Sequence, residues 1–190
     1  MKKVKKFFSL LPMLIIWLMI SVFLWGFVFT RITDTDPKHK VTLFIDCQVP
    51  GSVQLTVELE KNKKELGIRM VKVHPFTYAM LDSSVLRQAD LYIVKSSDID
   101  EYADWFAQLP EEMLVYSDLL SWDNIAWGIR IYNAETGEGA AVQYIDYTAD
   151  GTVTEDYYLL FGKESVHVPG NTGAVDDASL DIARSLLSML

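Results

Sequence analysis

The chain has 190 residues, half of them hydrophobic, and its 26 acidic and 17 basic residues give a net charge of −9. Five of the positive charges and none of the acids lie in residues 1–31, so the remainder holds 12 basic and 26 acidic residues, a net charge of −14. Such an acidic segment excludes nucleic acids and other polyanions as partners, because a polyanion is bound by a basic patch.

The N-terminal segment is typical of a membrane anchor. Residues 7–30 carry no charge and lie between four lysines and Arg31. At about 1.5 Å per residue, a helix of this length rises about 36 Å, and the hydrocarbon core of a bilayer is about 30 Å thick. We predict a single transmembrane helix at 7–32, in the cell membrane. Because lysines stay in the cytoplasm, residues 1–6 form a cytoplasmic tail and the rest of the chain lies outside.

The alternative to an anchor is a cleaved signal peptide. That reading requires a shorter apolar stretch followed by small residues at the cleavage site. The sequence "GFVFTRITD", at the end of the apolar stretch, contains no such site. We therefore favour an uncleaved anchor.

A linker and one folded domain follow the anchor. Residues 33–40 are polar and contain a proline, which is typical of a linker, and the domain is predicted over residues 41–190. The one cysteine, Cys47, cannot form an internal disulfide, so the domain must rely on its own hydrophobic core. A small buried role for this cysteine is favoured over a catalytic one.

Three short apolar segments indicate buried strands, at 41–46, 67–73 and 91–94. Residues 52–66 are ambiguous, because "VQLTVELE" alternates as a strand does, whereas "ELEKNKKEL" is rich in helix-forming residues. We favour a helix there, since buried parallel strands need covering helices.

The stretch after Lys95 has the pattern of an amphipathic helix. Its apolar residues recur at steps of three and four: Ile99, Tyr102, Phe106 and Leu109. Ser97, followed three residues later by Asp100, is interpreted as a helix cap, with a ligand contact as the alternative.

Beyond Pro110 the pattern changes to strands. "GIRIYN", "AAVQYIDY" and "VTEDYYLLF" are separated by turn-rich segments and predict an antiparallel meander. The segment "DDASLDIARSLLSML" predicts a C-terminal helix, which Asp176 or Asp177 caps.

The sequence contains none of the common catalytic motifs, so we predict that the domain is not an enzyme and has no catalytic residues. The three histidines are far apart, and "DYTADGTVTED" lacks the acidic twelfth position of a calcium loop. No metal site and no cofactor are therefore predicted. Trp122 and Trp127 are either core residues or a platform on which a planar ligand stacks.

Five segments between residues 40 and 133 follow one another in a set order: "KVTLFIDCQVPGS", a helix, "IRMVKVHPF", "AMLDSSVLRQADLYIVKSSDIDEYADWFAQL" and "WGIRIYN". This order resembles the first lobe of the type 2 extracellular solute-binding proteins of bacterial ABC importers. The resemblance implies a three-layer α/β domain, with parallel strands, an antiparallel meander and a C-terminal helix. A complete binding protein has two lobes, so this chain is similar to a single lobe held by a transmembrane helix.

In an open α/β sheet, ligands bind beyond the carboxyl ends of the parallel strands. With the two tryptophans, the candidate ligand-binding residues are Asp46, Gln48, Thr77, Tyr78, Lys95, Ser96, Trp122 and Trp127. Lys95 and Ser96 either face this surface or are solvated loop residues.

We expect a membrane-anchored extracytoplasmic binding or accessory domain, associated with a bacterial solute (ABC) transport system. Its expected partners are the membrane, a permease or another membrane subunit, and a small-molecule solute. The alternative is a structural or sensory membrane subunit that acts through lateral packing of its helix.

Overall fold

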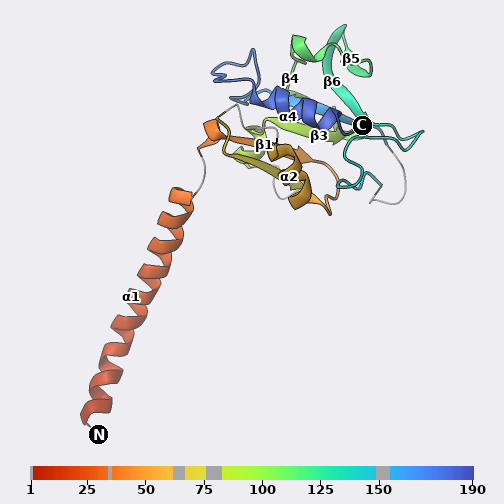
Figure 1. Cartoon of the computed structure of the whole chain (residues 1–190). Coiled ribbons are helices and arrows are strands. Elements are labelled where there is room, and N and C mark those ends of the chain that lie inside the picture. Colours follow the sequence, from red (N-terminus) through yellow and green to blue (C-terminus); the bar gives the residue numbers. More distant parts are fainter. Residues whose placement is uncertain (1, 34–35, 62–66, 76–82, 149–154) are drawn as a thin grey trace. The chain divides into compact units, whose positions relative to one another are not determined.

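The computed structural model describes residues 2–33, 36–61, 67–75, 83–148 and 155–190, without the side chains of residues 2–11, 28–33 and 85. These residues form two compact units, Met1–Asp36 and Pro37–Leu190 (Figure 1). We describe each unit by itself.

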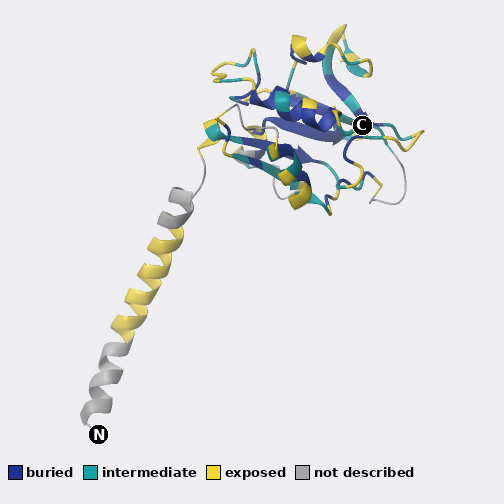
Figure 2. Cartoon of the chain, in the orientation of Figure 1, coloured by how far each residue is buried: buried dark blue, intermediate teal, exposed yellow. Residues whose placement is uncertain are grey.

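The first unit is the helix α1, Lys2–Thr33. Large apolar side chains along it, from Met13 to Phe27, are exposed (Figure 2). Among the helices as far as they are described, none meets the length and the apolar character that a membrane span requires.

The second unit is built on a seven-stranded mixed sheet with the order β2-β1-β3-β7-β6-β5, in which β4 also pairs with β7. The strands β1, β2 and β3 are parallel, and the other pairs are antiparallel. The bounds are β1 Lys40–Ile45, β2 Met70–Pro75, β3 Leu91–Lys95, β4 Phe106–Ala107, β5 Leu119–Trp122, β6 Ile125–Tyr132 and β7 Tyr157–Gly162. The domain is thus a mixed α/β structure, as the sequence predicts at that level.

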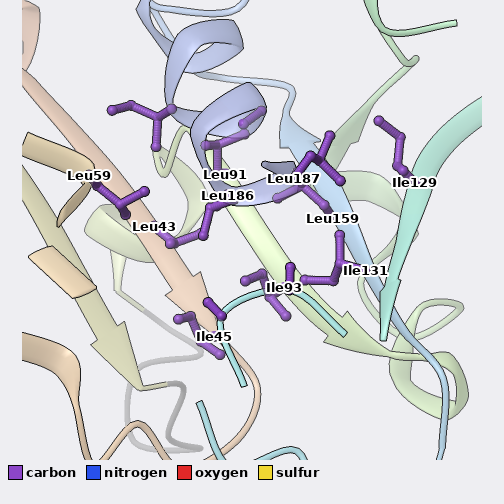
Figure 3. Packing of buried hydrophobic residues seen from close by; sticks show 14 of the residues in the cluster. Leu43, Ile45, Leu59, Leu91, Ile93, Ile129, Ile131, Leu159, Leu186 and Leu187 are labelled. Carbon is purple, nitrogen blue, oxygen red and sulfur yellow. The ribbon is translucent and has the colours of Figure 1, made fainter. Parts of the chain in front are cut away.

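One face of the sheet is covered by two helices, α2 (Ser52–Lys61) and α4 (Ala178–Leu187). Alternate strand residues such as Leu43 and Ile93 point to this face, because successive side chains of a strand lie on opposite sides. Figure 3 shows Leu186 and Leu187 of α4 packing over these strands. This face holds the larger hydrophobic core.

The opposite face carries an aromatic cluster under short elements. Phe44 and Tyr92 point to this side, where Tyr102 and Phe106 cover them, with Leu86 from the short helix α3 (Ser84–Arg87). The remaining short elements are the 3₁₀ helices η1 Pro37–His39, η3 Ser96–Asp98, η4 Ala103–Trp105 and η5 Glu111–Met113.

The prediction of an amphipathic helix after Lys95 is wrong. The chain forms two 3₁₀ turns and then the strand β4. The amide of Tyr102 donates to Ile99 O and that of Trp105 to Tyr102 O, which is the three-residue hydrogen bond of a 3₁₀ helix. A repeat of three residues still places Ile99 and Tyr102 on the aromatic cluster. The spacing of the apolar residues therefore belongs to 3₁₀ turns and not to an α-helix.

The predicted cap at Ser97 is wrong for the same reason. The residue before η3 is Lys95, which has no capping side chain, and Ser97 Oγ donates to the adjacent Asp98. Before α4, the N-cap residue is Asp177, as predicted for one of the two aspartates, but its side chain makes no capping hydrogen bond. Instead, Asp176 Oδ1, one residue earlier, accepts from Ala178 N at 3.1 Å.

The predicted meander differs from the structure in its middle strand. Residues 140–147 form turns, and the isolated bridge of Asp146 with Gln48 is the one β-bridge of this segment among the described residues. Tyr147 is buried by stacking on Tyr132, with ring centroids 4.5 Å apart. The strand that pairs with β6 on the side away from β7 is instead β5, over residues for which the sequence predicts no strand.

The other predicted elements lie close to observed ones. The strands at 41–46, 67–73 and 91–94 correspond to β1, β2 and β3, of which β2 begins later, at Met70. The helix at 52–66 corresponds to α2 as far as Lys61, and residues 62–66 lie outside the described residues.

The hairpin between β5 and β6 has a two-residue turn in which Asp123 and Asn124 have φ of 54° and 61°. Two positive φ values are typical of the type I′ turn, in which Asn, Asp and Gly are preferred. We expect Asn124→Val to destabilise the domain by about 1–2 kcal/mol, because a β-branched residue is strained at positive φ. Urea denaturation measures this, and Asn124→Gly, which removes the strain, should be neutral or stabilising.

Candidate functional site

Two surfaces of the second unit contain predicted site residues. The first is the carboxyl-edge rim, which we define as Asp46, Lys95, Ser96, Asp98 and Glu155. The second is the tryptophan groove, an open groove of about 620 Å³ that Trp122 and Trp127 line.

In the carboxyl-edge rim, two parallel strands end side by side. Asp46 follows β1, and its amide donates to Ile93 O of β3 at 2.7 Å. Lys95 ends β3, and its Nζ lies 3.3 Å from Asp98 Oδ2. The predicted approach of Asp46 and Lys95 is therefore present, and Asp98 joins them.

Burial raises the pKa of Asp46 to about 7. The charge of Lys95 acts to lower this pKa and that of Asp98 to raise it. One carboxyl oxygen of Asp46, Oδ2, is buried and has no hydrogen-bond partner among the described residues. Asp46 therefore changes charge near neutral pH, which makes the rim sensitive to pH.

The space below the rim is small. A cavity of about 10 Å³ lies between Asp46, Tyr92 and Tyr102. A single water molecule needs about 10–15 Å³, so this cavity is too small for a solute. A ligand at the rim would have to lie on its surface.

Ser96 and Gln48 have structural contacts at this edge. Ser96 Oγ donates to Glu155 Oε2 at 3.1 Å, and the amide of Ser97 donates to the same oxygen at 3.0 Å. The carbonyl of Gln48 accepts from Asp146 N at 2.9 Å, and its side chain is exposed. The remaining rim candidates, Thr77 and Tyr78, lie outside the described residues.

The tryptophan groove is bounded by three chain segments. These are the stretch around β4 and η5, the hairpin of β5 and β6, and the loop after β7. Its polar lining residues are Asp104, Gln108, Glu111, Lys163 and Asn171. Asn171 is held in place by its Nδ2, which donates to Gly162 O at 2.7 Å and to Ser165 O at 3.0 Å.

The two tryptophans form a parallel pair. Their ring centroids are 4.6 Å apart and their planes differ by 9°. Both are half-buried against the aromatic cluster, and Trp127 Nε1 is buried without an acceptor among the described residues. The sequence left open whether these residues belong to the core or to a ligand platform. In the structure they pack against the aromatic cluster and also line the open groove.

The rim and the groove lie toward opposite ends of β7. Along β7, Lys95 of β3 pairs with Tyr157, whereas Gly128, next to Trp127, pairs with Leu160. Three residues of strand separate these points by about 10 Å. The structure therefore does not bring the tryptophans together with Asp46 and Lys95, and the single set of candidate residues divides into two.

Sequence reasoning missed a buried polar cluster around His167. Asp90 accepts from Thr42 N at 2.7 Å and from Ser165 Oγ. The ring of His167 contacts Asp176 and the carbonyl of Pro37, not Ser165, so the serine and the histidine do not form a nucleophile–base pair. The signal in the sequence was weak, because these residues come from segments far apart in the chain.

No protein-family model matches the chain, and no curated protein matches it. Among solved structures, thiaminase I from Bacillus thiaminolyticus is similar at 12% identity with a TM-score of 0.34. The alignment covers 49% of this chain and 28% of the thiaminase chain.

This similar structure is that of an enzyme, and it contradicts the prediction that the chain is not an enzyme. We therefore withdraw that prediction. The similarity assigns neither a fold nor an activity to this chain, which is left without an enzymatic or a non-enzymatic assignment. In the described part of the chain, no group of three or more His, Cys, Asp or Glu residues is arranged to hold a metal ion.

Proposed function

We propose that the chain is a membrane-anchored extracytoplasmic domain that binds a solute in the tryptophan groove. The observation that carries the proposal is the groove itself, in which a pair of indole rings meets several hydrogen-bonding side chains. Ligand pockets commonly measure 300–1,000 Å³ and combine aromatic walls with a few polar groups, so a groove of about 620 Å³ has a suitable size.

The chemistry of the lining favours a solute with a flat apolar face and hydroxyl groups at its edge, as a sugar ring has. Indole faces stack on such apolar faces. Asp104 and Asn171 carry oxygens that accept hydrogen bonds from hydroxyls, and Lys163 donates them.

Membrane anchoring and a role in a bacterial ABC transport system belong to the same proposal. The uncharged stretch at 7–30 and the exposed apolar side chains of α1 support the anchor. The resemblance to one lobe of a type 2 solute-binding protein, with β1–α2–β2–α3–β3 in that order, supports the link to solute transport and a three-layer architecture. A short tether raises the local concentration of such a domain near a permease.

Solute binding is tested with the full chain in detergent micelles and a panel of neutral mono- and oligosaccharides, by isothermal titration calorimetry. We expect at least one sugar to bind and Trp122→Ala to weaken its binding about tenfold, since loss of one stacking contact costs on the order of 1 kcal/mol. Trp122→Phe, which keeps an aromatic face, should retain most of the affinity.

Asp46→Asn is the matched control for this experiment, because Asp46 belongs to the carboxyl-edge rim and does not line the tryptophan groove. It should leave sugar affinity unchanged. If Asp46→Asn weakens binding and Trp122→Ala does not, the solute lies on the carboxyl-edge rim and the groove assignment fails.

The second candidate is a structural or sensory membrane subunit that acts through lateral helix packing. The exposed apolar residues of α1 favour it, since α1 offers them to other helices as well as to lipid. Replacing residues 7–32 with an unrelated transmembrane segment separates the candidates. Loss of partner crosslinking and of function supports helix packing, and retention supports the binding domain.

A further inference from the structure

The described part of the chain holds a buried histidine where the second unit begins. His167 is 0% exposed and follows β7 in the loop that leads to α4. It connects this loop to Pro37, the first residue of the unit. The contact of His167 with Pro37 therefore lies at the start of the second unit.

Both ring nitrogens of His167 meet oxygen atoms that accept hydrogen bonds. Nδ1 lies 2.6 Å from Asp176 Oδ1, and Nε2 lies 2.9 Å from the carbonyl oxygen of Pro37. A carbonyl oxygen cannot donate, and an ionised carboxylate cannot donate either. Only the doubly protonated imidazolium satisfies both partners at once.

The surroundings of the ring favour that charged form. The charged groups that act on it are Asp90, which precedes β3, and Asp176, which precedes α4, while η1 contributes the carbonyl of Pro37. Burial acts to lower the pKa of His167, but the hydrogen bond to Asp176, the charge of Asp90 and the bond to Pro37 outweigh it and raise the pKa above its usual range.

We propose that His167 is a proton-operated latch that fastens the start of the second unit to the loop before α4. While the ring carries both protons, it holds Pro37 and Asp176 together. When it loses one, the remaining proton stays on the nitrogen that faces the carboxylate of Asp176, because a hydrogen bond to a charged acceptor is stronger than one to a carbonyl, and the bond to Pro37 is lost. Because the pKa is raised in the folded state, the latch is closed below that pKa and opens as pH rises through it.

The consequence of opening concerns the length of the connection to α1. With the latch closed, the unit begins at Pro37. With it open, the first residue held beside the sheet is His39, whose carbonyl accepts from the amide of Arg69 at 2.8 Å. Release of residues 37 and 38 adds at most about 7 Å to the reach of the connection. This consequence rests on the proposed membrane anchor, whereas the latch itself does not.

Amide hydrogen exchange of residues 38–41, followed by mass spectrometry on the full chain in detergent micelles, tests the latch. After correction for the intrinsic exchange rate, we expect protection to fall at least tenfold between pH 6 and pH 9. His167→Gln, which cannot gain a proton, should show low protection at both pH values.

Two variants serve as controls. His39→Gln changes a histidine of η1 outside the buried cluster and should keep the pH dependence of the unaltered chain. Asp90→Asn removes a negative charge that acts on the ring, so the transition should move to lower pH.

The proposal is overturned if protection does not change with pH, or if His167→Gln changes with pH as the unaltered chain does. Should His167→Gln fail to fold, the ¹⁵N shifts of the His167 ring decide the matter in the unaltered chain. A ring that stays doubly protonated to a higher pH than a free histidine supports the latch, and a ring that loses its proton at the same or a lower pH overturns it. None of these measurements depends on solute binding or on the anchor, so failure of the proposed function is a separate result.

Discussion

Gly162→Ala should destabilise the domain by about 3 kcal/mol or more, the largest effect that we expect from a single methyl group. A Cβ at this position would lie 1.9 Å from the carbonyl oxygen of Ala89, which is a backbone atom and cannot turn away as a side chain can. Gly162 ends β7 beside the residue that precedes β3, since its amide donates to Asp90 O at 2.9 Å. The close approach of these two backbone segments requires a residue without a side chain.

Gly137→Ala is the matched control. That glycine has a φ of +72° and nothing within 4 Å of an added Cβ, so its substitution introduces backbone strain without a clash and should cost about 1 kcal/mol. Urea denaturation of both variants gives the difference. If Gly162→Ala costs no more than Gly137→Ala, the backbones do not approach as closely as described.

Asp46→Asn should stabilise the domain by about 2 kcal/mol at pH 8 and by about a third of that at pH 5. Burial raises the pKa of Asp46 to about 7, whereas an aspartate in the unfolded chain titrates near 4. The folded state therefore favours the protonated form. The stability that this form contributes is complete below about pH 4 and is lost as pH rises through 7.

The size of this effect is limited by solvent. A difference of about three pKa units corresponds to about 4 kcal/mol, and partial access of water to Asp46 reduces it to about half. Free energies of unfolding at pH 5 and pH 8 measure it. Asp100→Asn, at an exposed aspartate just after Asp98 of the rim, should change stability little at either pH. An equal effect of Asp46→Asn at both pH values would contradict the burial of its carboxyl group.

The parallel strands could be predicted because their signals are local. Each of β1, β2 and β3 is a short apolar run between turn residues, and two of them are buried almost throughout. The stretch after Lys95 could not be predicted as it is. Apolar residues three apart fit both an α-helix and a 3₁₀ turn, and the pairing of β4 with β7, more than fifty residues later, decided between them.

The candidate site was predicted in its parts but not in its arrangement. Asp46 comes directly after β1 and Lys95 ends β3, so the order of the parallel strands predicts that the two residues lie close together. The place of Trp127 depends on the register of β6 against β7, which no local pattern determines. The contact of His167 with Pro37 joins residues 130 positions apart and left no signal in the sequence.

The position of β7 in the sheet has a consequence for how the polypeptide reaches its native state. This late strand pairs with β3, β4 and β6, so it joins the parallel half of the sheet to the β5–β6 hairpin. Contacts between residues so distant in the chain form slowly, because a long loop must close before they are gained. While the protein is being made, its two halves have no shared strand until residues 157–162 have emerged, and a ribosome stalled before that point would carry an incomplete sheet with an open central edge.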